Sequence, residues 1–208
     1  MTIPRVLLTG FPPFSNHPNN VSEEILREIS ISGIDDLQIV PTLLSVDEPG
    51  SREVSSEISR GVGYSAILHL GYSPDSTMIH LERFARNRYS MTVPDNSGRQ
   101  IKSGLIVEDA PLILETIAPT SLINASLGEK EIVSWSEDAG GFVCNETYFR
   151  TLLSASKSNV SPPRALFMHL PGSQFVPIEE QIAVVSIVSR CLCFSTQPEL
   201  LTTGQNHA

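Results

Sequence analysis

Short apolar runs alternate with helical patterns along this chain of 208 residues. Residues 5–9 and 65–70 are apolar, rich in β-branched or aliphatic side chains and followed by a glycine, as is typical of buried strands. Between them, residues 22–30 and 47–60 predict helices, the first with acidic residues in its opening turn. Such alternation is typical of a mostly parallel sheet with helices on both faces. We therefore predict an α/β fold.

The rest of the chain continues the pattern. Residues 37–44 form an apolar run interrupted by Pro41, which favours an outer strand because proline cannot donate to a ladder. Further strands are expected at 131–135 and 165–169, and further helices at 119–125 and 178–194. A chain of this length supports one full core and is short for two. We expect one domain over residues 1–208, with a flexible tail from about 197.

Charge and hydropathy exclude several classes of protein. A net charge of −9 without a Lys/Arg cluster would repel a polyphosphate backbone, so nucleic acid is not expected as a partner. No stretch approaches the roughly 20 apolar residues of a membrane span, and the first residues do not form a signal peptide. We therefore expect a cytoplasmic protein without a membrane partner.

The cysteines and glycines likewise exclude most cofactors. Three cysteines form an odd set without framework spacing, as expected for reduced thiols. Cys191 and Cys193 are too close in sequence to clamp a metal without histidine partners, so packing is the expected role. Phosphate-cradling, dinucleotide-binding and metal-ligand spacings do not occur. We predict neither a metal nor another cofactor.

The stretch 136–152 places Cys144 between a Gly-Gly pair and an apolar, aromatic pattern. The pattern predicts a helix that buries one side and has Cys144 in its first turn. Unpaired amides and the dipole of a helix N-terminus stabilise a thiolate, the nucleophilic form of cysteine. By itself, the stretch slightly favours a buried structural cysteine. The flexible glycines and the candidate partners of the thiol favour a nucleophile instead.

Two candidate partners follow apolar runs. His169 ends the run 165–169, just before Pro171, and Glu82 follows the apolar segment that begins at Met78. Ligand sites gather outside the carboxyl ends of strands in open α/β sheets, where we expect His169 and the Cys144 loop together. A carboxylate at the end of a strand can orient a histidine, so Glu82 is a candidate as well. A solvated glutamate is the alternative for Glu82. His69, inside its own apolar run, is expected to be a hydrogen-bonded core histidine.

These groups suit acyl transfer by a thiol. A cysteine nucleophile needs a base, here His169, whose tautomer a carboxylate such as Glu82 would fix. Backbone amides near residues 140–144 would form an oxyanion hole. Phe11 and Phe14 lie in a loop stiffened by two prolines, where they would either line a site or pack into the core.

Four motifs, in the same order, resemble the pyroglutamyl peptidase I family of cysteine peptidases, also called pyrrolidone carboxyl peptidases. TGFPPF at 9–14 resembles the family's TGFxPF loop, and LERFARN with VPDN resembles its ERVAxN and PDN segments. SEDAGGFVCN at 136–145 resembles the nucleophile motif S-x-x-A-G-x-[YF]-x-C-[ND]. FMHLP at 167–171 resembles the histidine motif [FI]-x-H-x-P. Together the motifs extend over nearly the whole chain.

The resemblance implies a three-layer α/β/α sandwich without metal or cofactor, often assembled as a homo-oligomer, here a dimer or tetramer. It implies Cys144 as nucleophile, His169 as base and Glu82 as orienting carboxylate. Phe11 and Phe14 would face the lactam ring of an N-terminal pyroglutamate. The residues that we predict to contact substrate are Phe11, Phe14, Asn20, Tyr72, Gly141 and Phe142.

Several residues depart from the family pattern, among them Pro12, Ser15 and Asn16 in the loop after the first strand. Tyr72 and Thr92 stand where many bacterial members carry Gln and Arg, although animal members lack both, and Gly141 replaces the usual Thr or Arg. The predicted function is that of a cysteine exopeptidase, which removes N-terminal pyroglutamate from peptides through an acyl-thioester. Two alternatives stay open. One is a thiol amidase for another small amide or lactam, and the other is a catalytically idle paralogue that binds a peptide terminus.

Overall fold

A computed structural model describes residues 2–158 and 162–194. Its centre is a six-stranded sheet with the strand order β2-β1-β3-β8-β4-β7. The strands are β1 (Arg5–Gly10), β2 (Gln38–Leu43), β3 (Ala66–Tyr72), β4 (Ile79–Glu82), β7 (Val133–Ser136) and β8 (Arg164–Leu170). The strands predicted from apolar runs are thus confirmed, whereas the predicted tail lies outside the described residues.

The sheet is mostly parallel, as predicted. β2, β1, β3 and β8 run in one direction, while β4 and β7 are parallel to each other and antiparallel to β8. β2 lies at one edge, where Pro41 pairs with Leu8 without having to donate to a second neighbour. The reversal at β4 has a direct effect on the geometry of the site.

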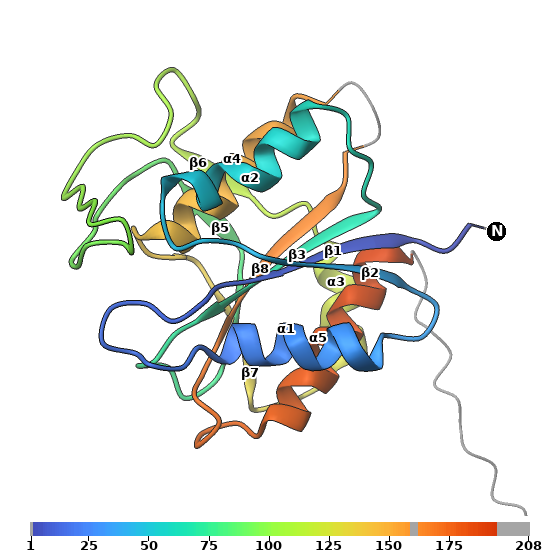
Figure 1. Cartoon of the computed structure of the whole chain (residues 1–208). Helices are drawn as coiled ribbons and strands as arrows, with labels where there is room; N and C mark the ends of the chain where they lie inside the picture. Colours follow the sequence, from blue (N-terminus) through green and yellow to red (C-terminus); the bar gives the residue numbers. More distant parts are fainter. Residues whose placement is uncertain (1, 159–161, 195–208) are drawn as a thin grey trace, which may run out of the picture.

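Helices cover both faces of the sheet (Figure 1). α2 (Glu48–Ser59) and α4 (Val143–Ser156) pack together on one face, and α1 (Val21–Ser32), α3 (Thr120–Leu127) and α5 (Ile178–Cys193) cover the other. This is the three-layer sandwich that the resemblance implied. In the described ranges, no helix combines the length and the apolar character needed to cross a membrane.

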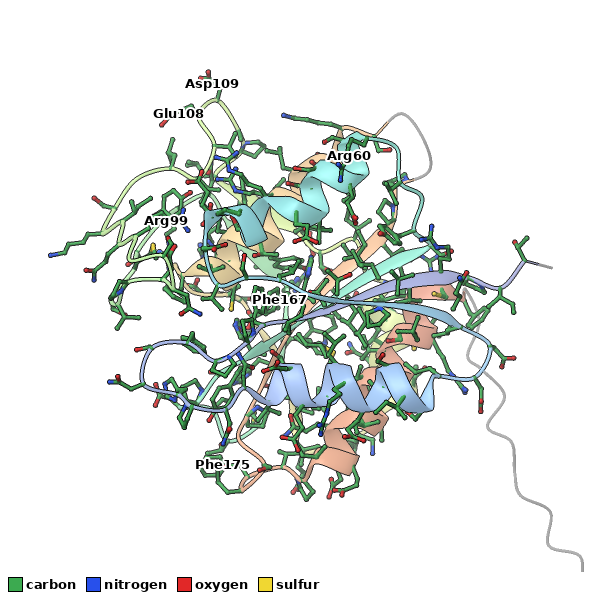
Figure 2. All side chains as sticks on the ribbon, viewed as in Figure 1. Arg60, Arg99, Glu108, Asp109, Phe167 and Phe175 are labelled. Carbon is green, nitrogen blue, oxygen red and sulfur yellow. The ribbon has the colours of Figure 1, made fainter. Side chains whose placement is uncertain are left out.

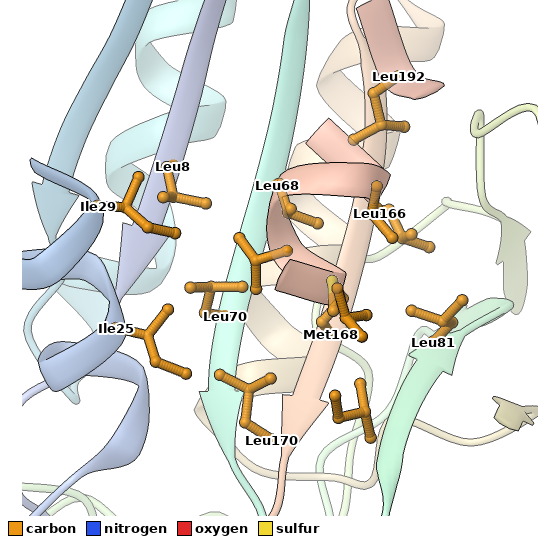
Figure 3. Close-up of a cluster of buried hydrophobic side chains, with 14 of the residues drawn as sticks. Leu8, Ile25, Ile29, Leu68, Leu70, Leu81, Leu166, Met168, Leu170 and Leu192 are labelled. Carbon is orange, nitrogen blue, oxygen red and sulfur yellow. The ribbon is translucent and has the colours of Figure 1, made fainter. Parts of the chain in front are cut away.

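Strand alternation divides the core into two clusters, because successive side chains point to opposite faces. Figure 3 shows the cluster beneath α1 and α5, with Leu8, Leu68 and Leu166 from three adjacent strands. Their neighbours Leu7, Ile67 and Phe167 belong to the other cluster, beneath α2 and α4. Figure 2 places Phe167 near the middle of the molecule. By the same alternation, His169 lies on the α2/α4 face.

A second, two-stranded sheet pairs β5 (Phe84–Arg86) with β6 (Ile113–Glu115) in antiparallel fashion. It was not predicted from the sequence, in which residues 85–100 appear only as polar, turn-rich chain. Between the two strands, residues 87–112 form a long segment, which we call the arm. Figure 2 shows Arg99, Glu108 and Asp109 on it, beside the ends of α2 and α4.

Candidate active site

Cys144 is the second residue of α4, as predicted from the sequence. Phe142, the N-cap residue just before α4, provides no side-chain hydrogen bond to the first turn. By contrast, Asn20 and Asp47 cap α1 and α2 with their side chains. Uncapped first-turn amides and the helix dipole favour a negative charge, here beside the half-buried thiol.

The burial of α4 differs from the prediction of one buried side. Nearly every residue is buried, including the polar Asn145, Glu146, Thr147 and Arg150. The helix packs against α2, β8 and the small β5/β6 sheet, so it has neighbours around most of its circumference. The polar residues are accommodated because they are paired; the Thr147 hydroxyl, for example, donates to the Val143 carbonyl at 2.8 Å.

His169 and Glu82 form a close pair, with 2.7 Å between Nδ1 of the imidazole and Oε1 of the carboxylate. Glu82 is buried, so the alternative of a solvated glutamate is excluded. Gly71 lies beside His169 in the ladder, and a Cβ there would lie 2.7 Å from the Phe167 ring and 3.1 Å from the imidazole Cδ2. The glycine therefore leaves the space that both rings need.

Glu82 is the last residue of β4 and His169 is the last but one of β8, so both lie at strand ends, as predicted. Because β4 runs antiparallel to β8, Glu82 is paired in the ladder with Phe167 and not with His169. The two side chains meet diagonally across the ladder, on the shared face of the sheet. Diagonal neighbours lie about 7–8 Å apart at Cα, which long side chains can bridge.

The ionised forms of His169 and Glu82 stabilise each other. Burial by itself lowers the pKa of His169, but hydrogen bonds with Cys144 and Glu82 and their negative charges raise it to about 10. Burial favours the neutral form of Glu82, yet the hydrogen bond with His169 and its charge hold the pKa of this carboxyl below its ordinary value. The surroundings of His169 and Glu82 therefore favour an imidazolium beside a carboxylate.

The other strand histidine, His69, is a core residue, as predicted. It is fully buried, with 2.8 Å between Nδ1 and the Thr9 hydroxyl and 3.0 Å between Nε2 and the Thr151 hydroxyl. Burial lowers its pKa to about 3, so it stays neutral. It takes no part in the candidate site.

A narrow pocket opens beside the thiol. Its lining is mostly apolar and aromatic and comprises Phe11, Phe14, Asn20, Val46, Tyr72, Phe142, Val143 and Cys144. Five of the six residues predicted to contact substrate are in this set, and Gly141 is not. Sequence reasoning missed Val46 and Val143. Val46 follows the expected strand 37–44, so its place near the carboxyl edge of the sheet was the available signal.

The aromatic residues form connected walls. The Phe11 ring lies 6.4 Å from that of Phe167, so this residue belongs to both the core and the pocket. The Phe14 ring is 5.9 Å from Phe142 and 5.3 Å from His17, whose ring meets the edge of Tyr72 at 5.7 Å. These contacts hold Phe14 at the pocket.

Asn20 lines the pocket, but its side-chain amide mainly shapes the loop from Phe11 to Phe14, which we call the aromatic loop. Its Oδ1 accepts from the amide and the hydroxyl of Ser22 at 3.0 and 2.7 Å. Its Nδ2 donates to the Pro12 carbonyl at 3.0 Å. The side chain thus caps α1 and ties the helix to the loop between Phe11 and Phe14.

Among residues 2–158 and 162–194, no set of three or more His, Cys, Asp and Glu side chains is arranged to hold a metal ion. All three cysteines are free. Cys191 is buried in the core beneath α5, which confirms its predicted packing role, and Cys193 packs against the same cluster.

A family model described as pyroglutamyl peptidase matches residues 4–197. The chain belongs to the pyroglutamyl peptidase family. It is 31% identical to a pyrrolidone-carboxylate peptidase of Pseudomonas fluorescens over 180 residues, which cover 86% of this chain and 81% of the relative. It is 29% identical over 168 residues to the pyrrolidone-carboxylate peptidase of Pyrococcus furiosus, with 80% of each chain covered.

Solved structures of pyrrolidone carboxyl peptidases have the same fold as this chain. Pyrrolidone carboxyl peptidase of Fervidobacterium islandicum superposes with a TM-score of 0.76 at 30% identity, covering 87% of this chain and 94% of that chain. A mutant pyrrolidone carboxyl peptidase from Pyrococcus furiosus gives a TM-score of 0.81 at 25% identity, covering 93% and 100%. Membership in the pyroglutamyl peptidase family makes the chain a cysteine peptidase.

Gly141 and Thr92, two departures from the pyroglutamyl peptidase pattern, lie outside the pocket lining. The Gly141 carbonyl accepts from the Ser90 amide at 2.9 Å, and a Cβ on Gly141 would lie 2.6 Å from the Ser90 Cβ. A Thr or Arg at this position would therefore displace Ser90. Thr92 is exposed, and its carbonyl accepts from the Gln100 side chain.

Proposed function

We propose that this chain removes N-terminal pyroglutamate from peptides. The observation that carries the proposal is the Cys144–His169–Glu82 hydrogen-bonded series, which ends at a narrow aromatic pocket. The names of the relatives, pyrrolidone-carboxylate peptidases, fit the same substrate class.

The pocket suits a five-membered lactam, which has a flat apolar ring with one hydrogen-bond donor and one acceptor. Phe14, Phe142 and Tyr72 offer the walls for such a ring, while Phe11 and Val46 complete an apolar lining. A narrow apolar pocket excludes charged and bulky N-terminal residues because their desolvation is uncompensated. We infer that recognition rests on shape and on a few polar contacts.

In the proposed mechanism, the Cys144 thiolate attacks the pyroglutamyl carbonyl and the carbonyl oxygen becomes an oxyanion. The first-turn amides of α4 stabilise this charge. The His169 imidazolium then gives its proton to the leaving amine as the C–N bond breaks, which leaves an acyl-thioester. A water molecule, deprotonated by His169, attacks the thioester, and pyroglutamate and the thiolate are released. Glu82 holds the imidazole in the required tautomer throughout.

The experiment that tests this function is release of a fluorescent amine from its pyroglutamyl amide under reducing conditions. We expect hydrolysis by the wild type and none above background by Cys144→Ala or His169→Ala. Cys191→Ala is the matched control, because it removes a thiol that packs in the core away from the pocket. Hydrolysis that survives Cys144→Ala would contradict the mechanism.

Alkylation provides an independent test of the thiol. We expect iodoacetamide to abolish activity by modifying Cys144, and a bound pyroglutamate to slow the modification, because both occupy one pocket. Mass spectrometry of tryptic peptides would identify the modified cysteine. Full activity after complete modification of Cys144 would contradict a thiol nucleophile.

Tyr72 favours one alternative, a thiol amidase for another small amide or lactam, since it lines the pocket where many bacterial members have Gln. A panel of amides with prolyl, alanyl and six-membered lactam acyl groups separates the two functions. Cleavage of one of these by a folded wild type that leaves the pyroglutamyl amide intact would favour the alternative.

We further propose that the enzyme acts in the cytosol and forms a dimer or tetramer. The free cysteines support the first proposal, since unpaired thiols are typical of reducing compartments. Exposed Leu105, Leu112 and Ile113 around the arm support the second. Sedimentation equilibrium measures the assembly, and a monomer at micromolar concentration would contradict it.

A further inference from the structure

A buried carboxylate, Glu146, lies in the first turn of α4, two residues after the nucleophile. Its side chain is only 1% exposed. Oε1 accepts from the Tyr89 hydroxyl at 2.8 Å and from Nε and Nη2 of Arg150 at 3.1 and 2.9 Å, and Oε2 accepts from Nη2 of Arg99 at 2.7 Å. Burial favours the neutral acid, but the hydrogen bonds from Arg99, Arg150 and Tyr89 hold the pKa of Glu146 below its ordinary value. A buried charge needs such partners to persist.

Arg99 reaches Glu146 from the arm, 47 residues away in the sequence. Its Nε donates to Asp95 Oδ2 at 2.8 Å, so the guanidinium bridges two carboxylates. Asp95 also accepts from the amides of Ser97 and Arg99, which closes the turn that carries the arginine. The guanidinium is therefore held in a fixed orientation when it meets α4.

The arm in turn contacts three segments that border the pocket. The Ser90 amide donates to the Gly141 carbonyl at 2.9 Å, just before the nucleophile helix. Asn96 Nδ2 donates to the Pro13 carbonyl at 3.0 Å in the aromatic loop. The Asn96 amide donates to the carbonyl of Val46, a pocket residue, at 2.9 Å. The position of the arm thus affects both sides of the pocket.

The arm has little regular structure to hold it in place. Within residues 87–112, strand pairing is limited to the isolated bridge between Tyr89 and Gly104. A long segment of this kind depends on side-chain contacts for its position. Two arginines make charged contacts between the arm and α4. Arg150 of α4 donates to the Tyr89 hydroxyl and the Ile106 carbonyl near the base of the arm. Arg99 of the arm pairs with Glu146 of α4.

We propose that Arg99 and Glu146 are positioning residues of this peptidase, whose ion pair holds the arm against α4. Through Ser90 and Asn96, the arm then keeps the loop before Cys144 and the aromatic loop at the separation that substrate requires. The proposal rests on the proposed function, because it assigns these residues to the same pocket. Neither residue is part of the pocket lining or of the Cys144–His169–Glu82 series.

The test compares Arg99→Met, Arg99→Lys, Glu146→Gln and the double variant Arg99→Met/Glu146→Gln. The matched control is Arg27→Met, which breaks an exposed ion pair with Glu28 on α1. We would measure kcat and KM for the pyroglutamyl amide well below each unfolding midpoint, normalised to the folded fraction of each variant from its own urea unfolding curve. This normalisation removes effects of unfolded protein.

We expect Arg99→Met to lower kcat/KM at least tenfold, with a rise in KM as the aromatic loop loosens. Arg99→Lys should recover part of the loss, since an ammonium keeps the charge but not the two-sided guanidinium geometry. The double variant should lose no more than the worse single variant, because both act through one ion pair. The control should stay within twofold of the wild type.

Two outcomes would overturn the proposal. One is Arg99→Met with wild-type kcat and KM and only a lower unfolding midpoint, which indicates a purely stabilising pair. The other is a multiplicative loss in the double variant. If the wild type does not cleave the pyroglutamyl amide, the alkylation rate of Cys144 at neutral pH still tests whether the Arg99–Glu146 pair positions the thiol. A severalfold slower rate in Arg99→Met than in Arg27→Met supports positioning of the thiol, and an equal rate refutes it.

Discussion

Replacing Glu82 by glutamine keeps the shape of the side chain and removes its charge. At the 2.7 Å separation from His169, a full charge pair is worth about 6 kcal/mol at an effective dielectric constant of about 20. The amide oxygen retains part of this attraction, so we expect a loss of about 4–5 kcal/mol. At about 1.4 kcal/mol per tenfold change, kcat should fall roughly 10³–10⁴-fold.

The assay is steady-state hydrolysis of the pyroglutamyl amide by Glu82→Gln beside Glu28→Gln, whose carboxylate pairs with Arg27 on the surface. Because the carboxylate stabilises the imidazolium, its loss should lower the pKa of His169 and move the alkaline limb of the pH profile to lower pH. A kcat within tenfold of the wild type, with an unshifted alkaline limb, would refute the view that Glu82 supports the charge on His169.

Three further predictions concern stability and the pocket. Since burial lowers the pKa of His69 to about 3, unfolding takes up a proton below about pH 6.5, and stability falls by up to about 1.4 kcal/mol per unit as pH drops. Urea unfolding of His69→Gln between about pH 6 and 4.5 should lack this slope. Gly141→Thr should destabilise by roughly 1–3 kcal/mol and reduce kcat by displacing Ser90, whereas Gly63→Ala, with open space around it, should not. Asn20→Ala should cost about 1 kcal/mol in thermal unfolding and raise KM more than it lowers kcat.

The strands and the nucleophile's place in its helix could be predicted because their signals are local. Apolar runs bounded by glycine or proline mark β1, β3 and β8 to within two residues. Cys144 was expected in a first turn because the glycine pair ends just before an apolar pattern. The partnership of His169 and Glu82 was also expected, from the chemistry that a thiol nucleophile requires.

The direction of β4 could not be predicted, because a strand of four residues carries no local information about its neighbours. The burial of Glu146 was missed for a related reason. A charged residue is expected on the surface, and the buried position is tolerable because Glu146 pairs with Arg150 of its own helix and with the distant Tyr89 and Arg99. The roles of Asn20 and Gly141 likewise depend on contacts with Pro12 and Ser90, which the sequence pattern does not specify.

The antiparallel course of β4 limits how the length of the chain can vary. Side chains alternate between faces, so one inserted or deleted residue within β4 would turn Glu82 towards α5 and leave His169 without its carboxylate. Insertions in the outer part of the arm would not alter this ladder. Transplanting the site into another scaffold would therefore require a pair of strands in a fixed mutual register, since no exchange of loops can recreate the contact between His169 and Glu82.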